Sequence, residues 1–210
     1  MANPKSMFSV VTPALYGLIL STPRLRQRLI PEGLRLSPYE VLECEATLYI
    51  VDAEGMHATL VRREKIRFLQ EGVSGILDHA WGDGVVVTSY RTNAGTIEGT
   101  LRDGGRRHLM IGLKRPMHRG EILEFEVIRE LFGGVMQSEE WLEMLIDHPV
   151  RQLIGNVVFP QERPCRWAAI QDGLKYRAIP IITSSGGSTI IHFRHPAAAP
   201  HTSYMLRWCW

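Results

Sequence analysis

Apolar and polar residues alternate with a period close to two from residue 38 onward, which is the pattern of half-buried β-strands. The segment 121–131 shows the alternation plainly in the run EILEFEVIREL. The same pattern predicts further strands at 39–51, 56–69, 85–91, 95–101, 107–113, 151–159, 165–170, 175–182, 188–194 and 203–210. Turn residues such as Asp-Gly and Asn-Ala-Gly separate these strands. Short strands divided this often indicate a mainly β fold, an antiparallel β-sandwich built as one sandwich or as two packed β halves.

The N-terminal segment departs from this pattern. Thr12-Pro13 and Thr22-Pro23 each place a capping residue before a proline at a first helical position. We therefore expect residues 1–37 to form a short helical segment docked on the β body. The apolar run within it is too short to span a bilayer, is interrupted by Pro13 and has no small-residue cleavage site after it. The sequence thus predicts neither a membrane anchor nor a signal peptide.

The segment 138–146 is ambiguous between helix and strand. Ser138 is a helix-capping residue, two acids follow it, and Trp141, Leu142, Leu145 and Ile146 fall on one helical face. Leu142, Met144 and Ile146 also alternate as in a strand. We favour a short helix that connects a first β half at 38–135 with a second at 136–210, the two forming one compact unit.

Composition is that of an ordinary globular protein. The 210 residues are 45% hydrophobic and 22% charged, with a formal net charge of +2. These values exclude a disordered chain and do not suit a protein whose whole surface binds nucleic acid. Cys44, Cys165 and Cys209 form no closely spaced pair, so we expect no disulfide, no structural metal and a reducing, cytoplasmic location.

No catalytic signature occurs in the chain. GxSxG, HExxH, the Walker A loop and GxGxxG are all absent, and nothing indicates a cofactor. The most reactive combination is Asp78, His79 and Trp81, which lies in a glycine-rich segment, 72–84, that we expect to be a loop. It gives an alternative hypothesis of a hydrolase-type site. Against it, side chains adjacent in sequence diverge, and Asp is common in turns.

Charge is unevenly distributed along the chain. Residues 102–119 contain six basic residues and one acid, whereas 121–147 contain eight acids and one base. Arginine forks bind anions in bidentate fashion, so the basic stretch predicts an anion site. Its candidate residues are Arg106, Arg107, His108, Lys114, Arg115, His118 and Arg119. The alternative is that opposite charges pair between neighbouring strands. No aromatic residue lies among the bases, which argues against a single-strand nucleic-acid platform.

The C-terminus ends in SYMLRWCW, which alternates as a strand. Tyr204, Leu206, Trp208 and Trp210 then share one face. This face indicates a last strand buried in the sandwich. The alternative is an exposed anchor in which Trp208 and Trp210 bind a partner.

These observations favour a non-enzymatic β-sandwich module, a regulatory or accessory component that binds a protein partner or an anionic small ligand. The sequence leaves its oligomeric state open.

Overall fold

The computed structural model describes residues 38–81, 86–103, 106–146 and 149–210. It confirms a mainly β protein. The predicted helical segment at 1–37 lies outside the described residues. The strands are β1 (Tyr39–Ile50), β2 (His57–Phe68), β3 (Val73–Trp81), β4 (Val86–Thr92), β5 (Gly95–Asp103), β6 (Arg106–Met117), β7 (Ile122–Phe132), β8 (Glu139–Ile146), β9 (Val150–Phe159), β10 (Trp167–Asp172), β11 (Lys175–Ala178), β12 (Ile181–Thr183), β13 (Thr189–Ala198) and β14 (Thr202–Cys209).

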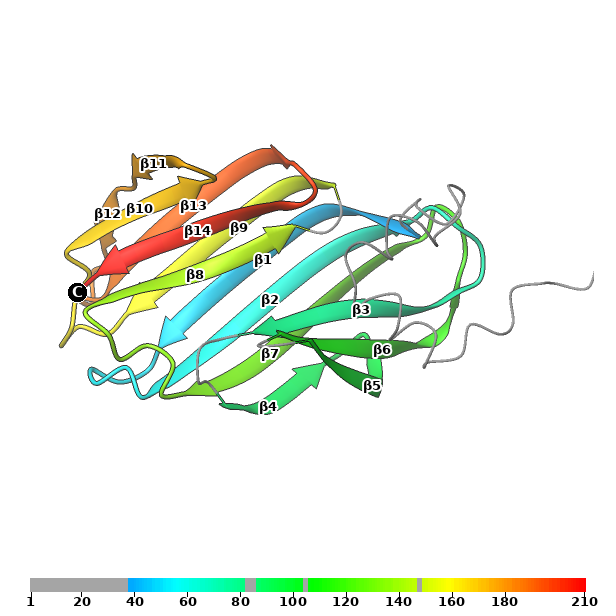
Figure 1. Cartoon of the computed structure of the whole chain (residues 1–210), viewed down its shortest axis with the longest axis horizontal. Coiled ribbons are helices and arrows are strands. Elements are labelled where there is room, and N and C mark those ends of the chain that lie inside the picture. The colour runs from blue at the N-terminus through cyan, green and yellow to red at the C-terminus, as the bar shows by residue number, and fades with distance from the viewer. Residues whose placement is uncertain (1–37, 82–85, 104–105, 147–148) are drawn as a thin grey trace, which may run out of the picture.

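A seven-stranded sheet forms the body of the molecule, with the order β12-β13-β9-β1-β2-β7-β4 (Figure 1). It takes strands from both sides of the predicted boundary at residue 135. Its strand pairs are antiparallel except for β1 and β9, which run parallel with Cys44 opposite Leu153. The expectation of a purely antiparallel sandwich is therefore corrected. The chain reaches β9 through β8, which belongs to another sheet, so it enters the large sheet in the same direction as β1.

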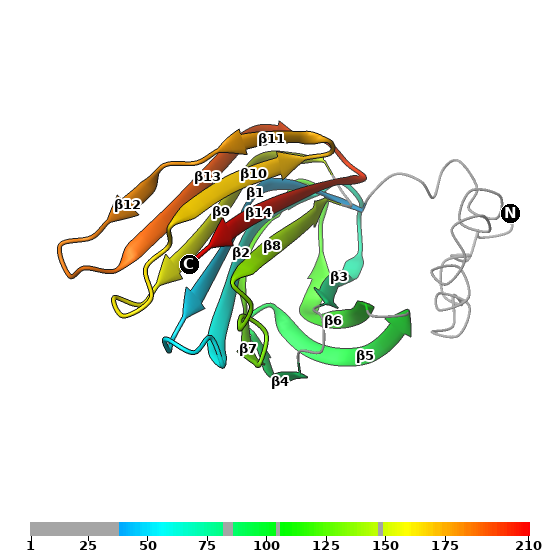
Figure 2. The same cartoon turned by 60° about the vertical axis from the view of Figure 1, so that its left-hand side comes forward.

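Two smaller sheets lie on the same face of the large sheet, as Figures 1 and 2 show. The four-stranded sheet β11-β10-β14-β8 lies over the end formed by β13, β9 and β1. The three-stranded sheet β3-β6-β5 lies near β2, β7 and β4. The covered face carries apolar residues that are almost fully buried, among them Ile66, Leu153 and Val157. Their burial supplies most of the driving force for the layered fold.

The opposite face of the large sheet is polar. Cross-strand ion pairs run over it, including Arg63 with Glu126 at 2.9 Å and Arg151 with Glu40 at 2.9 Å. Side chains of opposite charge on neighbouring strands stabilise a sheet when they lie opposite or diagonal to one another. This division into one apolar and one charged face explains the alternation in the sequence.

Three sequence expectations are wrong in detail. Residues 139–146 form strand β8 and not a helix, because pairing with β14 favours the period-two pattern that buries Met144 and Ile146. Residues 73–81 form strand β3, although the segment 72–84 was expected to be a loop. The predicted strand 175–182 is divided at Pro180 into β11 and β12, which belong to different sheets.

The C-terminal strand is buried, as its alternation predicts. Trp208 is 1% exposed and meets Phe159 edge to face at a centroid distance of 5.8 Å. The Trp210 indole nitrogen donates a hydrogen bond to the Gln137 carbonyl at 2.6 Å, and the Arg163 guanidinium lies 3.4 Å from the centre of its ring. Both tryptophans are thus interior residues, and the alternative of an exposed anchor at these positions does not agree with their burial.

Candidate functional site

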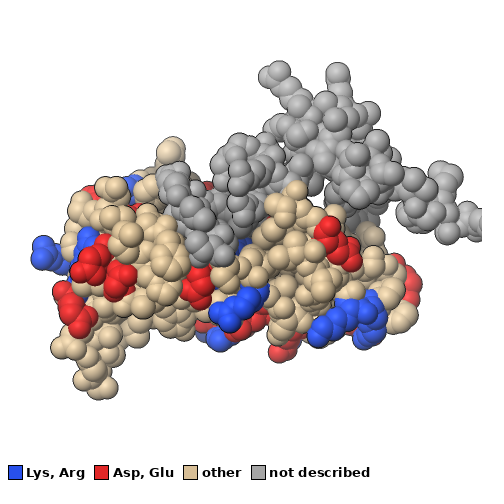
Figure 3. Space-filling view, turned by 90° about the horizontal axis from the view of Figure 1, so that it is seen from below, with Lys and Arg blue, Asp and Glu red and all other residues tan. Residues whose placement is uncertain are grey.

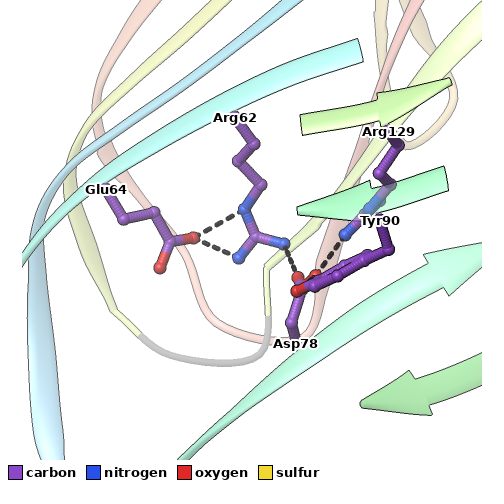
Figure 4. A network of polar contacts seen from close by, with 5 residues as sticks. All are labelled: Arg62, Glu64, Asp78, Tyr90 and Arg129. Carbon is purple, nitrogen blue, oxygen red and sulfur yellow. Dashed lines mark hydrogen bonds and ion pairs between the residues drawn. The ribbon is translucent and has the colours of Figure 1, made fainter. Parts of the chain in front are cut away.

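A network of charged and polar side chains is buried between the three-stranded sheet and the large sheet (Figure 4). Asp78, on β3, lies at its centre. Its Oδ1 accepts a hydrogen bond from Arg62 at 2.6 Å, and its Oδ2 accepts one from the Tyr90 hydroxyl at 2.7 Å and another from Arg129. Arg62 also binds Glu64 with two of its nitrogens. Strands β2, β3, β4 and β7 therefore meet at a single carboxylate.

The charges of this network balance. Two guanidiniums face two carboxylates, and the side chains of Asp78 and Arg129 are only 4% and 7% exposed. Burial alone raises the pKa of Asp78, but the charges of Arg129 and Arg62, with the hydrogen bonds from Arg129 and Tyr90, outweigh it and lower that pKa to about 2. Burial lowers the pKa of Arg62, yet Glu64 and Asp78 hold it well above its ordinary value.

This arrangement makes Asp78 a poor proton acceptor. A general base works best with a pKa near the working pH, whereas Asp78 is stabilised as an anion. Cys44, on β1, lies opposite Glu64 of β2, and burial followed by the charge of Glu64 raises the pKa of the thiol to about 12. A thiol that remains protonated is a weak nucleophile. The network is suited to joining two sheets rather than to acid–base chemistry.

His79 and Trp81, the other members of the alternative site, follow Asp78 on the same strand. In the backbone register of β3 and β6, His79 lies opposite His108 and Trp81 opposite Arg106. The Asp78 carboxylate is already bound by Arg62, Tyr90 and Arg129. A role for His79 and Trp81 stays a prediction.

The seven candidate anion-binding residues are spread along β6 and the turn after it. Arg107 and Arg115 stand eight positions apart in β6, which at about 3.3 Å per residue is roughly 26 Å. A small anion cannot contact both ends. Where the molecule is seen from below in Figure 3, acidic and basic side chains are intermingled. The candidate residues therefore extend over a longer stretch of β6 than one small anion can contact.

At the far end of β6 the basic residues meet acids. Arg115 binds Glu121 through both terminal nitrogens, at 3.0 and 3.1 Å, and the His118 ring contacts Glu71. The backbone nitrogen of Arg119 donates to the same Glu71 carboxylate at 2.9 Å. The two contacts of Glu71 join the β2–β3 turn to the β6–β7 turn, and the Arg115–Glu121 pair spans the second of these turns. They correspond to the alternative of opposite charges pairing between neighbouring segments.

The His118–Glu71 contact predicts a raised pKa for His118 that can be measured. The hydrogen bond that the His118 ring donates to the Glu71 carboxylate, and then the charge of Glu71, raise the pKa of His118 above 6.5. The pair therefore supports the fold below the unfolded-state pKa, and its contribution is lost as pH rises through the folded-state value. In an NMR titration, Glu71→Gln should move the His118 pKa back toward 6.5. Glu98→Gln on β5 should leave it unchanged, and equal shifts in both variants would contradict the assignment.

An aromatic surface that the sequence analysis did not identify covers the outer side of the four-stranded sheet. Three rings remain about half exposed there: Trp141 at 46%, Trp167 at 45% and Tyr176 at 55%. The strand registers place Trp141 opposite Arg207, Trp167 opposite Cys209, and Tyr176 opposite Gln171. Because directly opposed residues share a face, all three rings lie on the side away from the core. We call this set, with Arg207, Glu139 and Glu143, the aromatic face.

Arg207 lies at the centre of the aromatic face. Its Nη1 donates to the Tyr176 hydroxyl at 3.1 Å, its guanidinium lies 5.9 Å from the Tyr176 ring centre, and Glu139 stands 3.7 Å from its Nη2. Ala169 of β10 lies directly opposite Arg207, and its small side chain leaves room for Arg207 to extend across β10 to Tyr176 on β11. The available signal in the sequence was the alternation of 139–146, which as a strand would have placed Glu139, Trp141 and Glu143 together on its polar side.

The described part of the chain contains no group of three His, Cys, Asp or Glu side chains arranged to hold a metal ion. Within the same residues, no helix has the length and hydrophobicity needed to cross a bilayer.

Comparison with known proteins places the chain by fold only. No protein-family model matches it, and no curated protein is similar in sequence. A variant of an M1 zinc metallopeptidase from Deinococcus radiodurans, bound to a Tyr-Ser-Ala substrate, is similar with a TM-score of 0.51 and 11% identity, over 80% of this chain and 42% of that one. A two-domain M1 zinc metallopeptidase variant bound to L-tryptophan is similar with a TM-score of 0.50 and 11% identity, over 81% and 43%. The chain thus spans less than half the length of these structures.

Proposed function

We propose that this chain is a non-catalytic β module that binds a protein partner, as an accessory component of a larger assembly. The observation that carries the proposal is the aromatic face. Trp, Tyr and Arg are the residues that contribute most binding energy at protein interfaces, and here they lie together on one exposed sheet surface. An exposed patch with this composition on a folded domain is typical of an interaction site.

The other two candidate functions have less support. An anionic small ligand would need convergent bases, whereas the candidate bases extend along β6 and two of them are paired with acids. A hydrolase centred on Asp78 would need a carboxylate that accepts a proton, whereas Asp78 is held as an anion by two arginines. The comparisons concern the fold alone and do not choose between these functions, since the similar structures are metallopeptidases of which this chain covers 42% and 43%.

The test is purification of the full chain, after mild cross-linking, from its own host. We expect the wild-type chain to carry a stoichiometric protein and the double variant Trp141→Ala/Trp167→Ala to lose it. Tyr49→Ala is the matched control, because Tyr49 is 41% exposed but lies on the charged face of the large sheet. Retention of the protein by the double variant, or its equal loss in the control, would contradict the proposal. Hydrolase turnover that disappears in His79→Ala would favour the alternative function instead.

A further inference from the structure

The aromatic face also carries information about the chemistry of its partner. Apart from Arg207, its side chains form two groups. The first is the exposed rings of Trp141, Trp167 and Tyr176, and the second is the carboxylates of Glu139 and Glu143. The Glu139 side chain is 67% exposed, and Glu143 accepts a hydrogen bond from the Ser203 hydroxyl at 2.6 Å. Counting Arg207, the formal charge of the surface is one positive and two negative, or −1.

Both groups attract cations. The face of an aromatic ring is electrostatically negative and binds guanidinium or ammonium groups, with tryptophan the best of the rings. A carboxylate beside such a ring adds a charge-assisted hydrogen bond to the same cation. The surface already holds one guanidinium in this manner, since Arg207 lies over Tyr176 and beside Glu139.

From this charge complementarity we infer that the partner presents a basic, arginine-bearing segment to the aromatic face. The inference rests on the proposed function and adds the chemistry of the partner to it. Trp141 and Trp167 lie two strands and two residues apart, which at ordinary strand spacings is about 12 Å. Residues i and i+4 of an extended peptide are about 13 Å apart, so two arginines of one segment can reach both rings.

The experiment uses the full chain and two ten-residue peptides, one alternating Arg and Ser and the other alternating Glu and Ser. We expect tryptophan fluorescence and calorimetry to detect the Arg peptide only, with an affinity that falls as salt is added. Glu139→Gln/Glu143→Gln should weaken this binding by about tenfold or more. Glu54→Gln/Glu162→Gln removes the same charge from exposed positions off this surface and should leave the binding unchanged.

The outcomes separate the inference from the proposed function. Equal binding of both peptides, or equal weakening in the two double variants, would overturn the basic-partner inference. A further outcome is that the co-purified protein is lost by Trp141→Ala/Trp167→Ala and fully retained by Glu139→Gln/Glu143→Gln. In that case the proposed function as a binding module stands and the inference about the partner's charge fails. Self-association of the chain that the tryptophan variants abolish would assign the surface to a second copy and would likewise overturn the inference.

Discussion

Replacing Asp78 with alanine should destabilise the protein by about 3–5 kcal/mol, the cost typical of removing one partner from a buried ion pair. The variant leaves Arg62 and Arg129 directed at an empty position, and neither guanidinium can lose its proton to relieve the charge. The loss should appear as a lower midpoint in urea unfolding at pH 7 with an unchanged m-value. Asp172→Ala, at an exposed position on β10, is the matched control and should change stability by no more than about 0.5 kcal/mol.

Two further measurements identify charge as the cause. Formate has the carboxylate that Asp78→Ala lacks, and any ligand that binds only the folded state stabilises it. Formate should therefore raise the midpoint of the variant more than that of the wild type. The contribution of Asp78 should also be full above its ordinary pKa of 3.8 and disappear as pH falls toward about 2. A difference between variant and wild type that stayed constant across this range, with no response to formate, would mean that lost packing and not lost charge explains the effect.

The same network shows where sequence analysis reaches its limit. Alternation identified most strands because each has one apolar and one polar side. Strand β3 was missed, since its inward position 78 is an aspartate that breaks the apolar pattern. The groups that make burial of this aspartate possible lie 12, 16 and 51 residues away in the chain, on three other strands. No local pattern contains that information.

The candidate binding residues illustrate a related limit. The basic cluster was conspicuous in the sequence because its members are near one another along the chain. In a strand, however, each residue adds about 3.3 Å, so residues a few positions apart lie far from one another. The aromatic face was inconspicuous because its members come from β8, β10, β11 and β14 and meet only through strand pairing. The C-terminal strand could be predicted because its inward residues occupy every second position of one short segment. Its burial could therefore be inferred without knowing which distant strands pack against it.

Trp208→Ala should be the most damaging single change in the four-stranded sheet, with an expected loss of about 3–5 kcal/mol. The indole is 1% exposed and fills the space between its own sheet and Phe159 of the large sheet. Truncation to alanine leaves a cavity between two layers that the paired strands cannot close. Removal of residues 207–210 takes away Trp208, Trp210 and the hydrogen bond to Gln137 together, and it should prevent accumulation of soluble protein.

Two comparisons test whether the loss of stability in Trp208→Ala comes from the lost side-chain volume. The Trp208 indole nitrogen is buried without a hydrogen-bond partner among the described residues, so Trp208→Phe removes an unsatisfied donor while keeping an aromatic ring. It should lose clearly less stability than Trp208→Ala.

Trp141→Ala, which removes a half-exposed ring from the opposite side of the same sheet, should unfold like the wild type. If Trp141→Ala and Trp208→Ala shifted the urea midpoint equally, the assignment of one ring to the core and the other to a binding surface would be wrong. If the truncated chain folded normally, the C-terminal strand would not be the core element that its burial indicates.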